Sequence, residues 1–346
     1  MRQDVTLGIL RLCVSPGRAL SSSATRLQFP SARFLTHISP LRYYSSQRRP
    51  SPFSPTKPLG KTVASTLQDA ANPPPTTRPP PLDLPERKPE TSTFSHLFHT
   101  GKAYLTFYKN GLKQIYTNHR LLYPKKASDP IIEPGTRAYF LLRRRWAHDI
   151  RRLPLFAFLL LVCGEFTPLI VLAVPSLVPA TCRIPKQAEK VERQADSTRL
   201  RYLNNVKEGK AHNSAFAVAS VAQAFGVISS LWGRLPFSPP TMFSLAKLQP
   251  HCTYLVEDNY LLGQAGGVEA LIPEEVKLAC VARAISVSGR GDKELRRTLA
   301  EWLEMINEVD DQRHKHVRMH TLALVPREAW SDIRSKKLFE AMEISN

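Results

Sequence analysis

A long apolar run constrains this chain more than any other feature. Residues 153–174 are largely apolar and contain a single charged side chain, Glu165. As an α-helix the run would be about 33 Å long, close to the roughly 30 Å hydrocarbon core of a bilayer. Residues 155–162 are apolar on every side, whereas a helix at the surface of a soluble domain has only one apolar face. We therefore predict a transmembrane helix over residues 153–176; a helix buried inside a soluble domain is the alternative.

Two residues inside this run suggest a function. Glu165 would lie near mid-membrane, where a charged side chain is costly. Pro168 removes a backbone hydrogen bond and, with Gly164, predicts a kinked helix. Glu165, Pro168 and Asp149, which precedes the run, are therefore candidates for a proton-coupled cation pathway, which requires a homo-oligomer because one helix cannot enclose it. The alternative is a protonated Glu165 bonded to a carbonyl oxygen that Pro168 leaves free.

The N-terminal residues have the composition of a mitochondrial transit peptide. Residues 1–49 contain eight arginines spaced among apolar and hydroxyl residues, and Asp4 is their single acid. A secretory signal would instead contain a compact apolar segment. The sequence that begins at Arg42 is similar to a matrix-peptidase site, so we predict cleavage between Tyr44 and Ser45. A basic tail without a targeting role is the alternative.

A proline-rich stretch follows the leader. Residues 50–89 contain twelve prolines, including runs of three at 73–75 and 79–81. Proline cannot donate a backbone hydrogen bond, and the stretch has too few apolar residues for a core. We predict a disordered, extended spacer over residues 45–93.

The chain is strongly basic, with a formal net charge of +19 at pH 7. A basic surface attracts anionic partners, either RNA or a cardiolipin-rich membrane. A compartment in which most proteins are basic is the alternative explanation. Basic residues flank the apolar run on both sides, and their number mildly favours the N-terminal flank in the matrix.

After the apolar run the chain is patterned for helices. Residues 186–212 are charged and are typical of a solvated helix. A second apolar run, residues 215–233, is rich in Ala and Ser, so we predict a buried or interfacial helix of a soluble domain. Further on, Pro273 and the acids Glu274 and Glu275 indicate a helix start.

A second helix begins near Asp292, which can cap it, after a glycine-containing loop. This helix has one apolar face, formed by Leu295, Leu299, Trp302, Leu303 and Ile306. Four basic residues lie on or near the other faces of the helix–loop–helix unit and are the candidates for contact with ribosomal RNA: Arg283, Lys293, Arg296 and Arg297. Solvated helix faces are the alternative for each of them.

Residue spacing supports neither an enzyme nor a cofactor or metal site. The five cysteines are scattered and no pair has the spacing of a zinc or redox motif. No nucleophile–base pair or phosphate-binding loop is visible, so we expect no catalytic residues.

Several collinear motifs resemble the LETM family, over about residues 100–330. Residues 108–113, Tyr-Lys-Asn-Gly-Leu-Lys, are similar to its Tyr-x-x-Gly-x-Lys helix. Other motifs resemble the flanks and Glu-Pro core of its membrane span, at residues 143–156, 165–168 and 174–181. The last set resembles its ribosome-binding domain and closing segment, at residues 267–283, 295–303 and 322–327.

The resemblance implies a mitochondrial inner-membrane protein with an all-helical, matrix-facing domain that binds the mitochondrial ribosome. It also implies links to potassium or calcium exchange against protons, to volume control and to insertion of new membrane proteins. The chain departs from the family by lacking an EF-hand loop and a long coiled coil, and the middle of the domain, near 250–266, is shortened. These departures indicate a short form of the family.

We therefore expect a mainly α fold with one transmembrane helix followed by an all-helical soluble domain. The expected parts are a transit peptide 1–44, a Pro-rich linker 45–93, a basic helical juxtamembrane region 94–152, the span 153–176, a LETM-type domain 183–330 and a tail 331–346. The first functional hypothesis is a ribosome-associated factor at the inner membrane, in contact with anionic lipid. A cation exchanger that uses Glu165 is the alternative, and a structural factor is the third.

Overall fold

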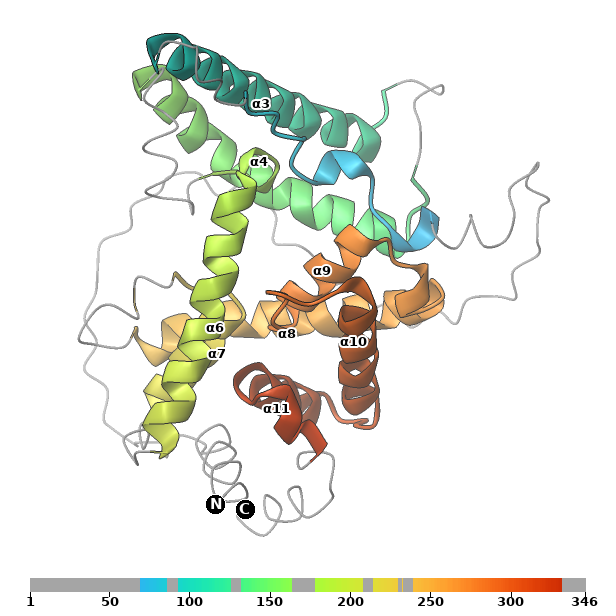
Figure 1. Ribbon diagram of the computed structural model, residues 1–346. Helices are drawn as coiled ribbons and strands as arrows, with labels where there is room; N and C mark the ends of the chain where they lie inside the picture. Colours follow the sequence, from blue (N-terminus) through green and yellow to red (C-terminus); the bar gives the residue numbers. More distant parts are fainter. Residues whose placement is uncertain are drawn as a thin grey trace, which may run out of the picture. The chain divides into compact units, whose positions relative to one another are not determined.

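The computed structural model describes residues 69–85, 93–125, 132–163, 178–207, 214–229, 232 and 239–331. No strand occurs among them, so the mainly α prediction is confirmed for this part of the chain. The α-helices are α3 (Thr93–Leu122), α4 (Arg137–Cys163), α6 (Pro185–Lys207), α7 (Ser214–Ala224), α8 (Thr241–Gln264), α9 (Pro273–Ala282), α10 (Asp292–Asn307) and α11 (Gln312–Leu324) (Figure 1). Short 3-10 helices are η1 (Pro75–Thr77), η4 (Ala180–Cys182), η6 (Val268–Ala270) and η7 (Arg327–Ala329).

Helices α3 and α4 pack against each other in antiparallel directions (Figure 1). The Tyr108 ring meets the Phe156 ring edge-on at 5.7 Å, and the His119 ring stacks on Trp146 at 5.5 Å. Phe107, Tyr108 and Phe156 form a small core with residues of the segment that contains η4. This core joins the two helices to the chain that follows the apolar run.

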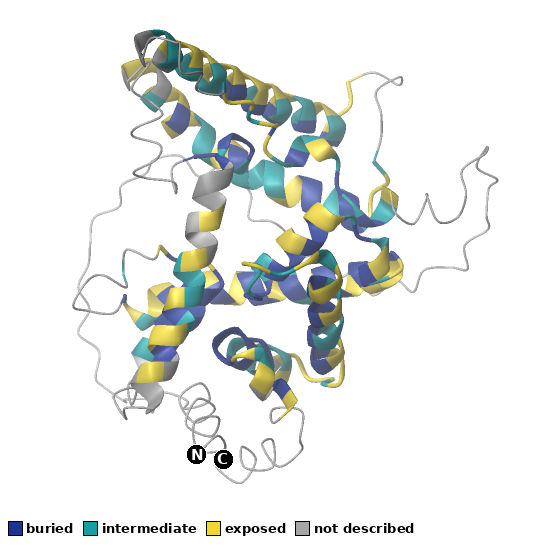
Figure 2. Cartoon of the chain, in the orientation of Figure 1, coloured by how far each residue is buried: buried dark blue, intermediate teal, exposed yellow. Residues whose placement is uncertain are grey.

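A larger core is shared by α7 to α11. Among its buried members are Leu255 of α8, Val276 of α9, Leu299 and Trp302 of α10, and Ala323 of α11. Helix α7 contributes small side chains that are nearly all buried, which explains the Ala-rich second apolar run without a membrane (Figure 2). The apolar face predicted for residues 295–306 is confirmed, because Leu295, Leu299, Trp302 and Ile306 are buried in it.

Residues 69–85, the described part of the proline-rich stretch, differ from the extended spacer that the composition predicts. Ala71 is fully buried in the larger core, and Leu82 packs against the small core of α3 and α4. The Asn72 side chain donates to the carbonyl of Ala270 at 2.7 Å and accepts from the Ile272 N–H at 3.0 Å. Arg78 pairs with Glu274 at 3.3 Å. Proline limits the backbone hydrogen bonds that this segment can form within itself, but other elements supply hydrogen-bond and ion-pair partners for it.

Within the described residues, no helix combines the length and the apolar character needed to cross a bilayer. Helix α4 covers the first part of the predicted transmembrane helix, up to Cys163. Residues 164–177, which include Glu165 and Pro168, lie outside the described part. So do the predicted cleavage site at Tyr44 and Ser45 and the tail beyond residue 331.

Candidate functional site

The two flanks of the apolar run meet at Asp149. Its carboxylate accepts from the N–H of Ala180 at 2.6 Å and of Thr181 at 3.2 Å, and His148 Nδ1 lies 2.9 Å away. Asp149 is buried, and these contacts satisfy the free N–H groups at the start of η4. Burial lowers the pKa of nearby Arg183, and the Asp149 carboxylate opposes this effect. The structure therefore gives this ion-pathway candidate a clamping role.

Gly111 completes this clamp from α3. A Cβ at Gly111 would lie 2.7 Å from the Cys182 Sγ and 2.8 Å from the Thr181 carbonyl oxygen. These distances are below van der Waals contact, so only glycine allows α3 to approach η4 this closely. Tyr108, one turn earlier, is buried against Phe156. The motif at residues 108–113 thus holds the segment that follows the apolar run.

A second cluster of polar residues is buried where α4 meets α8 and α9. Asp258 lies between two guanidinium groups: Arg137 Nε donates to it at 2.8 Å and Arg283 Nη2 at 2.7 Å. All three side chains are at most 2% exposed. Burial alone would raise the pKa of Asp258, but the two cations hold it below its usual range. The cluster therefore remains ionised at neutral pH and fixes α4 to α8.

A bidentate ion pair strengthens the same junction. Arg145 donates to both carboxylate oxygens of Glu275, at 2.8 and 2.7 Å, and also to Thr77 of η1. Glu275 is fully buried. Burial would lower the pKa of Arg145, but Glu275 outweighs it and the pKa is raised. Helices α4 and α9 and the proline-rich segment are joined at this point.

Two of the four predicted ribosome contacts are structural residues. Arg283 is fully buried; besides Asp258 it donates to Asn259 and to the Ala279 carbonyl, so its prediction as a surface contact is wrong. Arg296 donates to Asp292 and to the carbonyls of Val268 and Leu271. Its guanidinium fastens the chain that precedes α9. The sequence pattern places both arginines on or near a polar face of a helix. Only the tertiary contacts show that their side chains bind other parts of the domain.

Lys293 and Arg297 are exposed on α10. They are four residues apart, so they lie on one face of the helix, one turn from each other. Of the four predicted contacts, these two remain candidates for a macromolecular partner. Asp292, predicted as a helix cap, is instead the first residue of α10 and pairs with Arg296 at 2.7 Å.

A buried histidine adds pH sensitivity to this region. His251 of α8 donates its Nε2–H to the Ala282 carbonyl at 2.8 Å, because the carbonyl can only accept. Burial is the main cause that lowers its pKa to about 4, and the Arg144 and Arg283 cations act in the same direction. The imidazole is therefore neutral at neutral pH.

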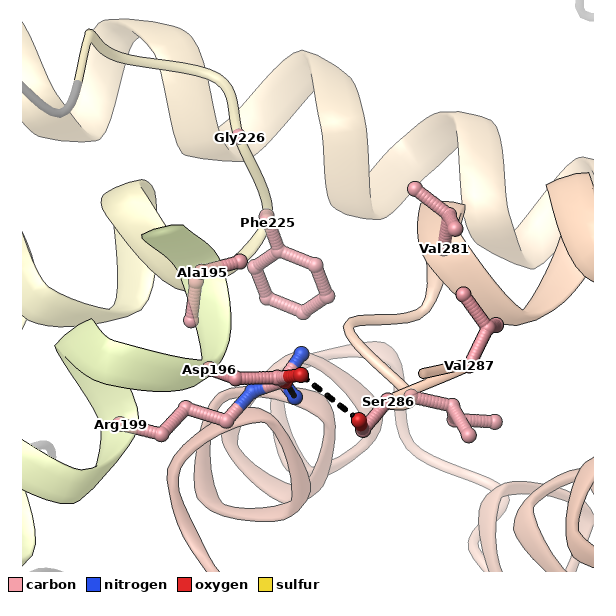
Figure 3. Close-up of a pocket in the computed structure, with 10 residues that line it drawn as sticks. Ala195, Asp196, Arg199, Phe225, Gly226, Val281, Ser286 and Val287 are labelled. Atoms are coloured by element: carbon pink, nitrogen blue, oxygen red, sulfur yellow. Dashed lines mark hydrogen bonds and ion pairs between the residues drawn. The ribbon is translucent and has the colours of Figure 1, made fainter. Parts of the chain in front are cut away.

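A small cavity of about 40 Å³ lies between α6, the turn after α7 and the loop after α9 (Figure 3). At its wall, Asp196 accepts from Ser286 at 2.7 Å and from Arg199 at 2.6 Å. A cavity of this size holds a water molecule but is far smaller than a typical ligand pocket. It does not supply a substrate site.

Two family models match the chain. Residues 227–322 match the LETM1-like RBD model. This segment is therefore similar to the ribosome-binding domain of LETM1-like proteins. The match confirms the predicted resemblance to the LETM family for α8 to α11. No curated protein and no solved structure matches the chain.

Residues 130–232 match a second model, the pentamidine resistance factor domain. This match covers α4, the apolar run, α6 and α7, and it includes the motifs that resemble the LETM membrane span. Arg137 and Arg145 belong to this match, while Asp258 and Glu275 belong to the segment that matches the LETM1-like RBD model. The two matched segments are therefore held together by the buried ion pairs described above, a junction that sequence analysis missed because its partners lie more than a hundred residues apart.

Proposed function

We propose that this chain is a membrane-associated factor that binds the mitochondrial ribosome through α8 to α11. The observation that carries the proposal is the match of residues 227–322 to the LETM1-like ribosome-binding domain. The helices of this segment share one well-packed core, which offers a rigid surface for a large partner. Supporting the biogenesis of inner-membrane proteins is the role we propose for such an association.

We assign the ribosome contact to the face of α10 that carries Lys293 and Arg297. Both side chains are exposed, whereas Arg283 and Arg296 are engaged within the domain. Two phosphate contacts would give a modest salt dependence, with a log–log slope on the order of −1 to −2. The remaining binding free energy would then come from shape complementarity and from contacts of uncharged groups.

Co-sedimentation of the full chain with mitochondrial ribosomes tests this proposal. We expect the wild-type chain to sediment with ribosomes and the double variant Lys293→Glu with Arg297→Glu to lose most of this binding. The matched control is Lys102→Glu with Lys109→Glu, which makes the same charge change on α3. Absence of wild-type binding, or equal loss in both variants, would contradict the assignment.

We further propose the mitochondrial inner membrane as the location, with the ribosome-binding domain in the matrix and anionic lipid as a partner. The Arg-rich leader supports import, and the predicted cut between Tyr44 and Ser45 supports a mature chain that begins at Ser45. Sequencing the N-terminus of the chain isolated from mitochondria tests this point. A mature chain that still begins at Met1 would remove the leader from the proposal.

The cation exchanger stays a prediction without support from the described residues. Glu165 and Pro168 lie outside them, and Asp149 uses both carboxylate oxygens to bind backbone N–H groups. Replacing Glu165 by Gln and measuring proton-coupled potassium or calcium flux in liposomes would test it. Unchanged flux would exclude Glu165 from such a mechanism.

A further inference from the structure

We propose that the outer face of α3 and the exposed apolar end of α4 form one surface that binds an anionic lipid bilayer from one side. The inference rests on the membrane part of the proposed function and identifies the surface and the lipid class. It does not depend on ribosome binding. The outer face of α3 consists of the exposed side chains of Phe98, Leu105, Tyr116, Lys102, Lys109 and Lys113.

Helix α3 exposes a stripe of large apolar side chains. Phe98, Leu105 and Tyr116 are 62%, 48% and 64% exposed. Steps of seven and eleven residues bring them back to nearly the same side of a helix with 3.6 residues per turn. The opposite side of α3 is used for packing, with Phe107, Tyr108 and Ile115 buried. The exposed stripe is therefore a second apolar face for which the described residues supply no cover.

The same side of α3 is positively charged. Lys102, Lys109 and Lys113 are exposed, and their spacing in the helix places them beside the apolar stripe. Residues 93–122 contain no Asp or Glu, so nothing within the helix neutralises these charges. Apolar side chains bordered by lysines are the pattern of helices that lie in the headgroup region of anionic membranes.

The end of α4 extends this surface. Leu155, Phe158 and Leu161 are exposed, Leu161 by 84%. Because Tyr108 contacts Phe156 and His119 contacts Trp146, α3 and α4 run antiparallel. The apolar end of α4 therefore lies alongside the half of α3 that carries Phe98 and Leu105. A bilayer that receives one of these surfaces is in reach of the other.

Contacts across the apolar run show that both of its flanks lie on one side of such a bilayer. Asp149, before the run, bonds to Ala180 and Thr181, after it, at 2.6 and 3.2 Å. Arg137 likewise bonds to Asp258 at 2.8 Å. A single pass would separate these partners by the roughly 30 Å hydrocarbon core, so it is incompatible with the contacts. The charge rule places the N-terminal flank in the matrix, and the family resemblance places the C-terminal domain there. Both are satisfied if the two flanks lie together on the matrix side.

RNA is the other anionic partner that a row of lysines could attract. Lysines on RNA-binding surfaces contact phosphates, and the aromatic residues beside them stack on bases. On α3 the stripe includes Leu105, and the neighbouring exposed surface of α4 is mostly aliphatic, with Leu155, Leu161 and Val162 beside Phe158. This apolar content matches the headgroup–acyl boundary of a bilayer.

Vesicle flotation with the full chain tests the lipid part. The probes are neutral phosphatidylcholine vesicles and vesicles in which about a third of the lipid is cardiolipin. We expect binding to the anionic vesicles only, weakened by the triple variant Lys102→Gln, Lys109→Gln, Lys113→Gln on the order of a hundredfold, since each charge contributes about 1 kcal/mol near such a surface. The matched control removes three charges from the ribosome-binding domain at Lys277, Lys293 and Arg297 and should bind as the wild type does.

A second variant separates insertion from simple charge attraction. Phe98→Ser with Leu105→Ser keeps every lysine and changes only exposed positions, so folding should be retained. We expect this variant to float less than the wild-type chain at low salt as well as at high salt. Equal binding to neutral and anionic vesicles, an equal effect of both triple variants, or unaltered binding of the serine variant would overturn the proposal. Binding of α3 to RNA in preference to vesicles would also overturn it.

Protease sites inserted before α3 and after residue 331 test the one-sided arrangement in mitochondria. We expect both sites to be protected in mitoplasts and both to be cleaved in inverted inner-membrane vesicles. Cleavage of one site and protection of the other in the same preparation would overturn it. A chain that sediments with ribosomes but fails these tests removes this inference alone, whereas one that passes them without binding ribosomes removes the ribosome proposal alone.

Discussion

Helices α3 and α4 differ from helices α8 to α11 in how much positive charge they carry and in how much of it is exposed. Residues 93–163, which form α3 and α4, contain twelve Lys and Arg against three Asp and Glu. Residues 239–331, which form α8 to α11, contain eleven against thirteen. In the first region Lys102 and Lys109 are exposed, whereas in the second Arg283 and Arg318 are buried. A strongly basic net charge therefore says little about which region meets an anionic partner.

The comparison also separates arginine from lysine. In α8 to α11 most of the described arginines form ion pairs or donate to carbonyls; Arg327, for example, pairs with Glu301, and Arg318 donates to the Met305 carbonyl. The planar guanidinium is suited to such fixed geometry. Helix α3 carries mainly lysines on its outer face, where a flexible, hydrated charge can follow a mobile headgroup layer.

The largest effect is expected when the buried network loses its acid. Asp258→Ala leaves Arg137 and Arg283 buried without their carboxylate, which should cost about 3 to 5 kcal/mol of unfolding free energy. Urea unfolding measures this. The control is Glu294→Ala, which breaks the more exposed pair with Arg290 and should cost at most about 1 kcal/mol. Similar losses in both variants would show that the buried cluster has no special role.

Acid should destabilise helices α8 to α11 through the buried His251. The pKa of His251 is about 4 in the folded chain and about 6.5 when unfolded, so the unfolded chain binds more protons between these values. The contribution of neutral His251 to the free energy of unfolding is therefore fully present above pH 6.5. Between pH 6.5 and pH 4 it falls by roughly 1.4 kcal/mol for each pH unit. Urea titrations from pH 7 to pH 4 measure this slope. His251→Gln should reduce it; an unchanged slope would exclude His251.

A methyl group at the close contact between α3 and η4 should destabilise the clamp. Gly111→Ala places its Cβ against Cys182 and the Thr181 carbonyl, and overpacking of this kind costs about 1 to 3 kcal/mol. Gly101→Ala, on the same helix but in open space, should instead stabilise α3 by about 0.5 to 1 kcal/mol. Thermal unfolding of the pair measures both signs. Equal behaviour of the two variants would refute the close contact.

An effect no larger than that of Gly111→Ala is expected in the docked proline-rich segment. Asn72→Ala removes two hydrogen bonds, to Ala270 and Ile272, and should weaken docking by about 1 to 3 kcal/mol. Hydrogen exchange should show faster exchange of the Ile272 amide. The exposed Asp83→Ala serves as the control. Unchanged exchange at Ile272 would show that residues 69–85 do not cover this part of the domain.

Local signals in the sequence predicted the helices well. Pro273 and its two following acids mark the start of α9, and the apolar face of residues 295–306 is the buried face of α10. Both signals act within one or two turns of helix, so they can be recognised without tertiary contacts. The family resemblance was also carried by short collinear motifs, and the match to residues 227–322 confirms it for that segment.

Long-range partners could not be predicted in this way. Nothing near Arg283 in the sequence indicates that Asp258 and Trp302 surround it. The docking of residues 69–85 could not be predicted either. Composition shows that this segment cannot form a core by itself, but it does not show which other elements the segment packs against. Asp149 was chosen for its charge near the apolar run, and only the contact with η4 shows that it joins the two flanks.

The central claim is that two separate surfaces let this chain join ribosomes to an anionic membrane. Flotation of mitochondrial ribosomes with cardiolipin-containing vesicles tests it most directly. We predict that ribosomes float only when the wild-type chain is present. The α3 lysine variant should leave the chain on unfloated ribosomes, and the Lys293 and Arg297 variant should leave it on ribosome-free vesicles. Ribosomes that do not float with the wild-type chain, or that float equally with either variant, would contradict the account.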